Sequence, residues 1–407
     1  MRIPISTDQP RYVDSSAFLI ALTLLCVTAM SSTTISPIML GQYVDSAGLT
    51  ERLAGLVAAS EASGYVLAQA LLAAVAHRWS RRGLALSSMV FTLAGNIATL
   101  WVAGFLPLAG ARLVTGFGAG VALATMGASI AARKEPQRGY SVVTLFALLY
   151  AVLLLAVSGA VAQRFGLRGL IAIVLVLNGV GLIACLWIPS RIDAPPSLPD
   201  APGAAPAPHT RPRDIMRLCA TLLLLYIAHN ALWSYQERMG VALGLARSAV
   251  GVILAISVGG GIVGAAVAAF AGMRKGLAAP QLLSMAALIV SAVLVANVRS
   301  AAIFAISATL IKAAWFFGLP YLQAALARLD TTGRAVVAGG SLQTLGTMLG
   351  TAAAAYVVPY GRGYVGVFAA VIYLICIPLC LSALRRIDRA AVPRMPPSET
   401  PSLGEKT

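Results

Sequence analysis

Long apolar stretches alternate with short polar gaps along the whole chain. A membrane helix needs about 20 mostly apolar residues to cross a hydrocarbon layer about 30 Å thick. Twelve stretches meet this requirement, near residues 17–42, 52–76, 84–104, 107–132, 139–163, 169–189, 215–238, 247–272, 277–297, 300–327, 332–358 and 363–384. The pattern predicts an all-α membrane protein with twelve transmembrane helices.

Basic residues are concentrated in every second gap between these stretches. With both termini placed on one side, that side carries 21 of the 30 Lys and Arg residues, and the opposite gaps carry seven. The remaining two, Arg112 and Lys312, lie inside predicted helices. Because cytoplasmic loops carry the excess of Lys and Arg in membrane proteins, both termini are predicted to be cytoplasmic.

A proline-rich segment divides the apolar stretches into two sets of six. Eight prolines from residue 189 to residue 212 prevent a continuous helix or strand there. The expected organisation is a cytoplasmic tail at 1–16, a six-helix bundle at 17–189, a cytoplasmic linker at 190–214, a second six-helix bundle at 215–386 and a cytoplasmic tail at 387–407.

Composition supports a membrane protein and argues against several other classes. Hydrophobic residues make up 59% of the chain and charged residues 11%, which is unlike a water-soluble domain. The net charge of +16 lies in short loops and the tails, where it can orient the chain and contact anionic lipid headgroups, so no nucleic acid partner is expected. The five cysteines and three histidines show no metal-ligand spacing, and no phosphate-binding loop or nucleophile motif is present. We therefore expect no metal, no cofactor and no enzyme activity.

The two sets of six stretches carry a weak internal repeat. An offset of 196 positions superposes five identical pairs, namely Gly48 on Gly244, Leu49 on Leu245, Gly55 on Gly251, Gly64 on Gly260 and Arg78 on Arg274. The pairs follow the predicted topology in order. They indicate two parallel six-helix repeats related by an axis along the membrane normal.

The fourth apolar stretch contains an arginine followed by regularly spaced glycines. Leu108, Arg112, Gly116, Gly118 and Gly120 resemble a motif of the major facilitator superfamily, and the string RFGLRG at 164–169 is similar to that family's outer turn. The resemblance covers nearly all of residues 17–386. It implies two pseudo-symmetric six-helix bundles around a central cavity lined by the first, fourth, seventh and tenth helices. It also implies helix packing by the three glycines and secondary transport as the activity.

The chain departs from the family pattern at two places. In the loop AHRWSRRG, His77 and Ser80 occupy positions that commonly carry Asp and Gly, while Arg78, Arg81 and Arg82 remain as candidate gating residues. The fifth stretch lacks the Gly and Pro signature of many drug/proton antiporters, which argues against that branch.

Two cations and one carboxylate inside predicted helices are the sharpest functional candidates. An ionisable group at mid-bilayer costs at least about 2.5–3.5 kcal/mol, so such groups face a cavity or a partner. Lys312 lies near the middle of its helix and is a candidate for substrate binding, or else is neutralised by Glu61 or held by backbone carbonyls. Arg112 is a candidate for substrate binding, or else is a gate-stabilising or snorkelling arginine. Each of the two cations precedes a glycine by six positions, Gly118 and Gly318. Their depths differ, because Arg112 is 21 residues from Arg133 and Lys312 is 16 from Arg328, so the two are expected to be quasi-equivalent rather than symmetric.

Glu61 lies in the small-residue string AASEASG of the second stretch. A buried carboxylate without a partner can exchange a proton near neutral pH, which makes Glu61 the leading candidate for proton coupling. The alternative is a permanent ion pair with Arg112 or Lys312. His229 is a weaker candidate for proton coupling, with a satisfied core histidine as its alternative.

Polar and aromatic side chains near these groups suit an organic substrate. The string YIAHNALWSYQER contributes His229, Asn230, Trp233, Tyr235 and Gln236 as candidate binding residues, and Gln343 is a lesser candidate. Ser32 belongs to a hydroxyl-rich part of the first stretch, which otherwise predicts a helix kinked at Pro37.

Together these features favour a secondary active transporter that moves a small organic solute, preferably an organic anion, in symport with protons by alternating access. We expect it to work as a monomer in the inner membrane of a bacterium, with the solute, protons and the lipid bilayer as its partners. The alternatives are a drug or sugar efflux transporter of the same fold and a non-transporting membrane sensor.

Overall fold

The computed structural model describes residues 12–75, 79–190, 212–274, 276–330 and 334–391. Within these ranges the regular structure is helical and no strand is present. Most of the predicted linker at 190–214 and of the two tails lies outside the described residues, as does Arg78. The all-helical membrane class predicted from the apolar pattern is confirmed.

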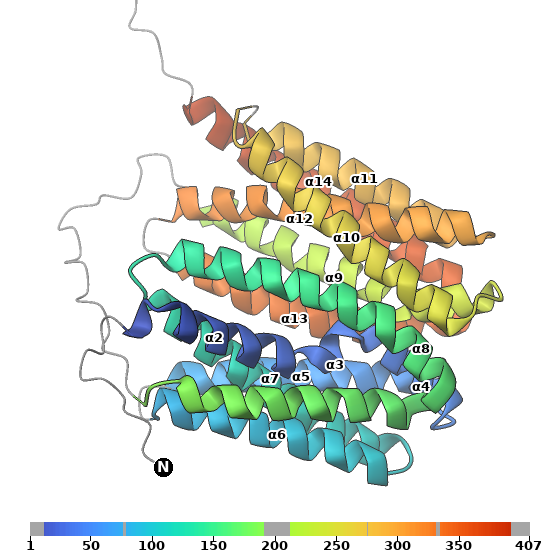
Figure 1. Cartoon of the computed structure of the whole chain (residues 1–407). Coiled ribbons are helices and arrows are strands. Elements are labelled where there is room, and N and C mark those ends of the chain that lie inside the picture. Colours follow the sequence, from blue (N-terminus) through green and yellow to red (C-terminus); the bar gives the residue numbers. More distant parts are fainter. Residues whose placement is uncertain (1–11, 76–78, 191–211, 275, 331–333, 392–407) are drawn as a thin grey trace, which may run out of the picture.

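Two groups of helices lie beside one another in Figure 1. The first group contains α2 (Ser16–Ala29), α3 (Ser31–Thr34), α4 (Ser36–Asp45), α5 (Glu51–Val75), α6 (Arg81–Trp101), α7 (Phe105–Ala131), α8 (Pro136–Ala184) and η2 (Cys185–Trp187). The second contains α9 (Pro212–Ala242), α10 (Arg247–Ala271), α11 (Ala278–Ala296), α12 (Ala301–Leu329), α13 (Arg334–Val357), η3 (Val358–Tyr360) and α14 (Arg362–Ala391). The face on which α2 begins and α14 ends is the terminal face, and the opposite face is the distal face.

Local sequence explains where two of the expected spans are broken or joined. Side-chain hydroxyls of Thr28 and Ser31 donate to carbonyls in the preceding turn, and Pro37, which lacks an amide hydrogen, is the second residue of α4. The first expected span is therefore divided among α2, α3 and α4. The fifth and sixth expected spans are joined in α8, which turns back at Gly166 with φ 60° and ψ −151° (Figure 1). Glycine adopts this positive φ without a steric penalty.

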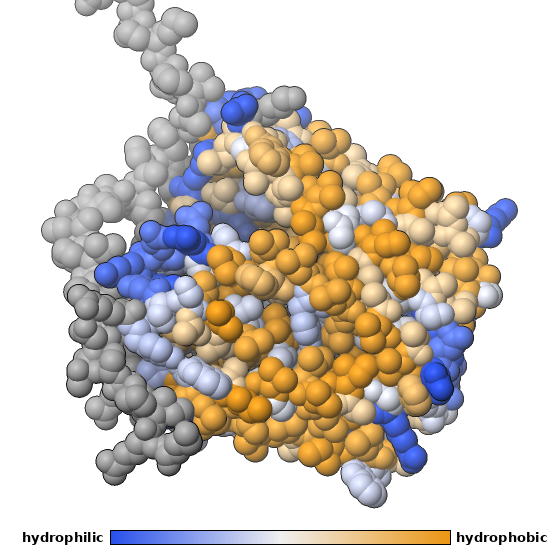
Figure 2. All heavy atoms as spheres, viewed as in Figure 1, coloured by the Kyte–Doolittle hydropathy of each residue, from blue (hydrophilic) through white to orange (hydrophobic). Residues whose placement is uncertain are grey.

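The surface of the molecule matches a bilayer. Among the described residues, nine helical segments are long and apolar enough to cross a membrane, and Pro136–Trp187 is the longest. Figure 2 shows hydrophobic side chains across the middle of the visible face and hydrophilic ones toward its two ends. Many leucines, isoleucines, valines and phenylalanines are exposed, which a soluble protein would not leave uncovered. The exact number of twelve spans stays a prediction.

Helix contacts within the two groups follow the same plan. In the first group α5 and α6 pack on α7, and in the second α10 and α11 pack on α12. A Cβ atom added to Gly64 would lie 2.2 Å from the carbonyl oxygen of Leu113, and one added to Gly260 would lie 2.6 Å from Cγ2 of Thr309. Gly260 lies 196 positions beyond Gly64, and Thr309 lies 196 positions beyond Leu113, which is the offset found in the sequence.

The two groups meet mainly along two crossings, α5 with α13 and α8 with α10, and α4 also contacts α9. A Cβ atom on Gly55 would lie 2.8 Å from Cβ of Ala355, and one on Gly251 would lie 2.8 Å from Cα of Gly159. The offset of 196 positions relates Gly55 to Gly251 and Gly159 to Ala355, so the two contacts are equivalent in the repeat. Small residues at these crossings let the helix backbones approach closely, as they do between many membrane helices.

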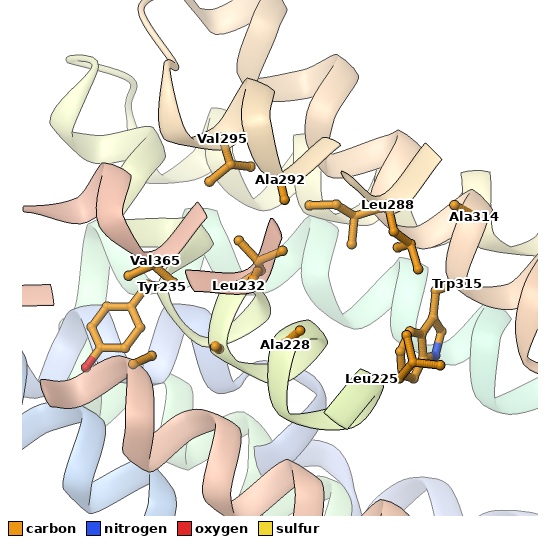
Figure 3. Packing of buried hydrophobic residues seen from close by; sticks show 14 of the residues in the cluster. Leu225, Ala228, Leu232, Tyr235, Leu288, Ala292, Val295, Ala314, Trp315 and Val365 are labelled. Atoms are coloured by element: carbon orange, nitrogen blue, oxygen red, sulfur yellow. The ribbon is translucent and has the colours of Figure 1, made fainter. Parts of the chain in front are cut away.

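The core of the second group positions one wall of the space between the groups. Buried residues from α9, α11, α12 and α14 contribute to this core, among them Leu225, Leu232, Leu288, Ala292, Trp315 and Val365 (Figure 3). Trp315 lies close to Leu225 in this view and is 6% exposed. Its position is therefore determined by packing.

The crossing of α8 and α10 yields a direct stability prediction. Gly251→Leu should separate the two backbones and destabilise the protein by about 1–3 kcal/mol, the usual cost of overpacking. The measurement is the thermal unfolding temperature of the purified protein in detergent. Gly259→Leu on the same helix is the matched control, because a Cβ atom there meets nothing within 4 Å. Equal unfolding temperatures for the two variants would contradict the proposed contact.

Candidate functional site

A cavity of about 340 Å³ lies between the two groups of helices. Its lining comes from both groups and includes Thr33, Glu61, Tyr65, His229 and Lys312. A second hollow shares Leu123, Gly340 and Gln343 with this lining and extends to residues near the start of α6, including Arg81. The cavity therefore adjoins a hollow that leads toward the terminal face.

Glu61 and Arg112 form a buried ion pair at the edge of the cavity. Arg112 donates from Nη2 to Glu61 Oε2 at 2.7 Å and from Nε to the same oxygen at 3.1 Å. Its Nη1 donates to Asn96 Oδ1 at 2.8 Å. Arg112 is fully buried, whereas Glu61 lines the cavity. Of the two alternatives left open for Glu61, the structure contains the pair with Arg112.

Gly116 makes this ion pair possible. A Cβ atom at position 116 would lie 1.8 Å from the carbonyl oxygen of Glu61, so only glycine lets α7 approach α5 this closely. Gly118 and Gly120 serve the same purpose, because added Cβ atoms would collide with Thr92 and Ala68. The three glycines of the arginine motif therefore lie in helix contacts.

Lys312 lies on the opposite wall, among nitrogen and aromatic groups. Its Nζ is 3.2 Å from Nε2 of His229 and 3.6 Å from the centre of the Trp233 ring. The His229 ring stacks on Trp315 with centroids 3.9 Å apart. Within the described part of the chain, no carboxylate lies within 4.0 Å of Lys312 Nζ. Glu61, which lines the same cavity, pairs with Arg112 instead. Neutralisation of Lys312 by Glu61, expected as one alternative, is absent from this structure.

Lys312 and Arg112 are not equivalent in the repeat. The offset of 196 positions pairs Arg112 with Ala308 and Lys312 with Gly116. The matching six-residue spacing to Gly118 and Gly318 therefore does not reflect the symmetry of the fold. The lysine has no charged counterpart in the first half, so the wall of the cavity is asymmetric in charge.

A ladder of polar contacts joins α9 to α13 beside this cation. Tyr226 donates to Gln343 Oε1 at 2.7 Å, and Asn230 Nδ2 donates to Thr347 Oγ1 at 3.2 Å. Ser234 and Thr351 continue the ladder one turn further along each helix, with hydroxyls 3.0 Å apart. Sequence reasoning named Asn230 and Gln343. Their partners were missed, although the four-residue spacing of Gln343, Thr347 and Thr351 is a helix-face signal.

The structure separates the predicted binding residues into two sets. His229, Asn230, Trp233, Lys312 and Gln343 line the cavity. The other four are absent from that lining, namely Arg112, Ser32, Tyr235 and Gln236.

Each residue of the second set has a different location. Ser32 is buried in the first group and donates to Asn96 Oδ1 at 3.4 Å. Tyr235 donates to the backbone oxygen of Glu51 at 2.9 Å, near the distal face. Gln236 is buried with neither side-chain polar atom hydrogen-bonded. Arg81 and Arg82 begin α6 at the terminal face, and the Arg81 amide donates to the Ser190 carbonyl at 3.0 Å.

Ion pairs between the two groups close the distal face. Arg238 donates from Nη1 to Asp45 Oδ2 at 2.9 Å and from Nε to Glu51 Oε1 at 3.2 Å. Arg362 reaches the same Glu51 oxygen at 2.6 Å, and Arg247 contacts Asp45. We call these five residues the distal seal. Sequence reasoning had assigned the arginines to distal loops but had not identified their carboxylate partners.

Glu237 extends the distal seal into the protein interior. Its Oε1 accepts from Arg247 Nε at 3.2 Å, and the residue is 0% exposed. Gly41 on α4 faces this carboxylate so closely that an added Cβ atom would overlap it. The cavity is therefore separated from the distal face by charged contacts, while its hollow extends toward the terminal face.

Comparison with known proteins agrees with this arrangement. The family model of the Major Facilitator Superfamily matches residues 21–340, and the chain belongs to that superfamily. Family and structural neighbours are transporters rather than enzymes. No curated protein matches the chain in sequence.

Several solved transporters share the fold at low sequence identity. The nucleoside transporter NupG has a TM-score of 0.72 at 13% identity, covering 90% of this chain and 99% of its own. The xylose transporter XylE from E. coli, in an inward open conformation, has a TM-score of 0.69 at 13% identity, with 91% and 99% covered. A mutant peptide transporter, POT, in complex with alafosfalin has a TM-score of 0.68 at 15% identity, with 90% and 95% covered.

The buried ion pair predicts a large cost for one conservative change. Glu61→Gln would leave the guanidinium of Arg112 buried without a counter-charge, a loss of about 3–5 kcal/mol. We expect a lower unfolding temperature and a lower yield of folded protein. Glu135→Gln is the control, because the Glu135–Arg138 pair is exposed and such pairs contribute about 0–1 kcal/mol. A Glu61→Gln protein as stable as the wild type would instead support Glu61 as a proton carrier.

The distal seal predicts a change in accessibility. Arg238→Gln removes contacts to Asp45 and Glu51, so the cavity should open more often to the distal side. A single cysteine at Thr347, in a protein without the native cysteines, should then react several-fold faster with a membrane-impermeant maleimide added from that side. Arg299→Gln, an exposed distal arginine, is the control. An unchanged labelling rate for Arg238→Gln would show that other contacts close this face.

Proposed function

We propose that the protein is a secondary active transporter that carries a small organic anion across the membrane in symport with protons. The observation that carries this proposal is the position of Lys312. This cation lines a cavity between the two halves of a transporter fold and has no carboxylate partner among the described residues. A membrane protein keeps such a charge at mid-depth for a functional reason in most cases.

The charges around the cavity favour an anion over other solutes. Glu61 and Arg112 neutralise each other, so Lys312 leaves the lining with one positive charge. Two opposite charges 4 Å apart attract by about 4 kcal/mol at an effective dielectric constant of 20. The present contact of Lys312 with the Trp233 ring contributes about 0.5–2 kcal/mol. An anionic group can therefore replace the ring as the partner of the ammonium.

The size and lining of the cavity limit the rest of the solute. At about 340 Å³ the cavity lies at the lower end of the range for small-molecule sites. Tyr226, Trp233 and Trp315 offer aromatic surface beside the cation, and Asn230 and Gln343 offer polar groups. A compact organic acid with a short apolar or aromatic body fits this description better than a sugar or a cationic drug.

The arrangement of the two faces supports alternating access. The distal seal closes one side, and the hollow beyond Gln343 leads toward the other. The excess of basic residues on the terminal side favours a cytoplasmic terminal face. The structure would then correspond to an inward-facing state of a monomer in a bacterial inner membrane, with both tails and the linker in the cytoplasm.

Two groups of the cavity lining are candidates for the coupled proton, Glu61 and His229. Protonation of Glu61 would break its ion pair with Arg112, so the carboxylate serves as proton carrier only if Arg112 finds another partner. His229 contacts no carboxylate in the described part of the chain. A drug or sugar transporter remains the alternative of the same fold, and a non-transporting sensor the alternative of another class.

Ligand stabilisation and flux test the proposal together. Benzoate or lactate should raise the unfolding temperature of the purified protein, because a ligand stabilises the state it binds. Glucose and tetraphenylphosphonium should not. Lys312→Gln should abolish the shift, while Arg299→Gln should keep it. Vesicles containing the wild-type protein should then exchange the stabilising anion across the membrane.

Three results would argue for the alternatives. Stabilisation by tetraphenylphosphonium alone would favour a cationic drug, and stabilisation by glucose alone would favour a sugar. Anion binding without any flux in vesicles would favour a sensor.

A further inference from the structure

We propose that the His229–Lys312 pair, rather than Glu61, takes up the coupled proton, and that it does so when an organic anion binds. This inference rests on the proposed transport of anions. Its structural basis is the contact of two basic side chains inside a cavity, with Lys312 Nζ 3.2 Å from His229 Nε2. Both residues line the cavity, so water and a solute can reach them.

The contact allows the pair only one positive charge. A hydrogen bond at 3.2 Å requires one nitrogen to donate and the other to accept. When Lys312 is an ammonium, His229 must accept at Nε2 and is therefore a neutral ring with its hydrogen on Nδ1. A second proton on the ring would turn both partners into donors and place two like charges next to each other, which the low dielectric of the interior opposes.

The surroundings of the pair provide no compensating charge nearby. Besides His229 and Lys312, the titratable groups that line the cavity are Tyr226 on α9 and Glu61 and Tyr65 on α5. The neighbouring helices also contain buried tyrosines and a cysteine, among them Tyr43, Tyr235, Tyr321, Tyr373 and Cys376. Toward the distal face lie the charged groups Glu237 and Arg238 on α9, Asp45 on α4 and Arg247 on α10. Asp45 and Arg247 are engaged with each other at the distal face. On α13 the groups that line the cavity are neutral amides and hydroxyls, and across the cavity Glu61 is held by Arg112. The nearby tyrosines and cysteine are uncharged at neutral pH.

His229 also has an unused hydrogen-bonding group. Its Nδ1 is buried and has no hydrogen-bond partner, while one face of the ring stacks on Trp315 at 3.9 Å. The stack holds the ring in place without satisfying its polar edge. The ring is therefore positioned by an apolar contact and leaves Nε2 as the nitrogen that faces Lys312.

An arriving anion changes this balance. Its negative charge attracts the ammonium of Lys312, which turns away from His229 and frees the lone pair of Nε2. A proton from the bulk solvent, relayed through cavity water, then adds to Nε2, giving an imidazolium that donates a second hydrogen bond to the anion. One proton and one monoanion are bound together, no covalent bond other than N–H is made, and the carried unit is electrically neutral.

The experiment measures how many protons the protein takes up with each anion. Calorimetric titrations with benzoate, lactate and benzenesulfonate, all ionised at pH 7.5, are run in two buffers that differ in ionisation enthalpy. The wild-type protein should take up about one proton per anion, and its Kd should rise about tenfold per pH unit at alkaline pH. His229→Gln keeps an acceptor for Lys312 but binds no proton. It should bind the same anion without proton uptake and with a pH-independent Kd.

Controls separate this inference from its alternatives. Glu135→Gln removes an exposed carboxylate outside both the cavity and the distal seal and should behave as the wild type. His229→Asn provides a second variant if His229→Gln does not fold. Proton uptake by either His229 variant equal to that of the wild type would overturn the inference in favour of Glu61. Wild-type binding without proton uptake would overturn the inference for both groups. Absence of binding of all three anions would overturn the proposed anion site itself.

A second measurement uses the unmodified protein in vesicles. Uptake of the bound anion should follow a pH gradient and should not respond to a potassium diffusion potential, because the carried unit is neutral. Uptake driven by the potential would show that more than one charge moves with each anion, which contradicts a one-proton pair.

Discussion

The ion pair between Glu61 and Arg112 sets the charge of the space between the two halves. Because Arg112 uses two of its nitrogens on one oxygen of Glu61, this carboxylate is not free to serve the opposite wall. A buried charge is tolerated when it is paired and hydrogen-bonded, and Asn96 completes the set of partners. The positive charge of Lys312 is therefore left without an internal counter-charge, and the chemistry of the cavity follows from that.

The two halves of the molecule are alike at some positions of the repeat and different at others. The offset of 196 residues relates the helix crossings that join the halves, down to individual glycines. The same offset places Lys312 opposite Gly116, and Gly116 is the residue that lets α5 approach α7. One position of the repeat thus supports packing in the first half and carries charge in the second. Duplicated helices preserve backbone contacts, while single side chains differ between the copies.

The fold and part of the site could be predicted from the sequence for a physical reason. The length of the apolar stretches reflects the thickness of the membrane, and the distribution of basic residues reflects its two sides. Both constraints apply to every transmembrane helix. His229, Asn230, Trp233 and Lys312 line one cavity. Their position there could be predicted because polar groups inside apolar helices face a cavity or a partner rather than lipid. The choice between Arg112 and Lys312 as the partner of Glu61 could not be predicted, because it depends on the rotation and depth of the helices. The distal seal could not be predicted either, because its ion pairs depend on which loops of the two halves meet.

At the two crossings Gly55 approaches Ala355 and Gly251 approaches Gly159, and none of these four residues has a side-chain rotamer to change. The contacts that must break when the distal face opens are ion pairs, and several of their members are between 11% and 40% exposed. Mobile ions screen such partly exposed charges over about 8 Å at physiological salt. If the protein alternates between two access states as proposed, we expect the salt concentration outside the distal face to shift the balance between them, so the medium itself would act on the conformation of the protein.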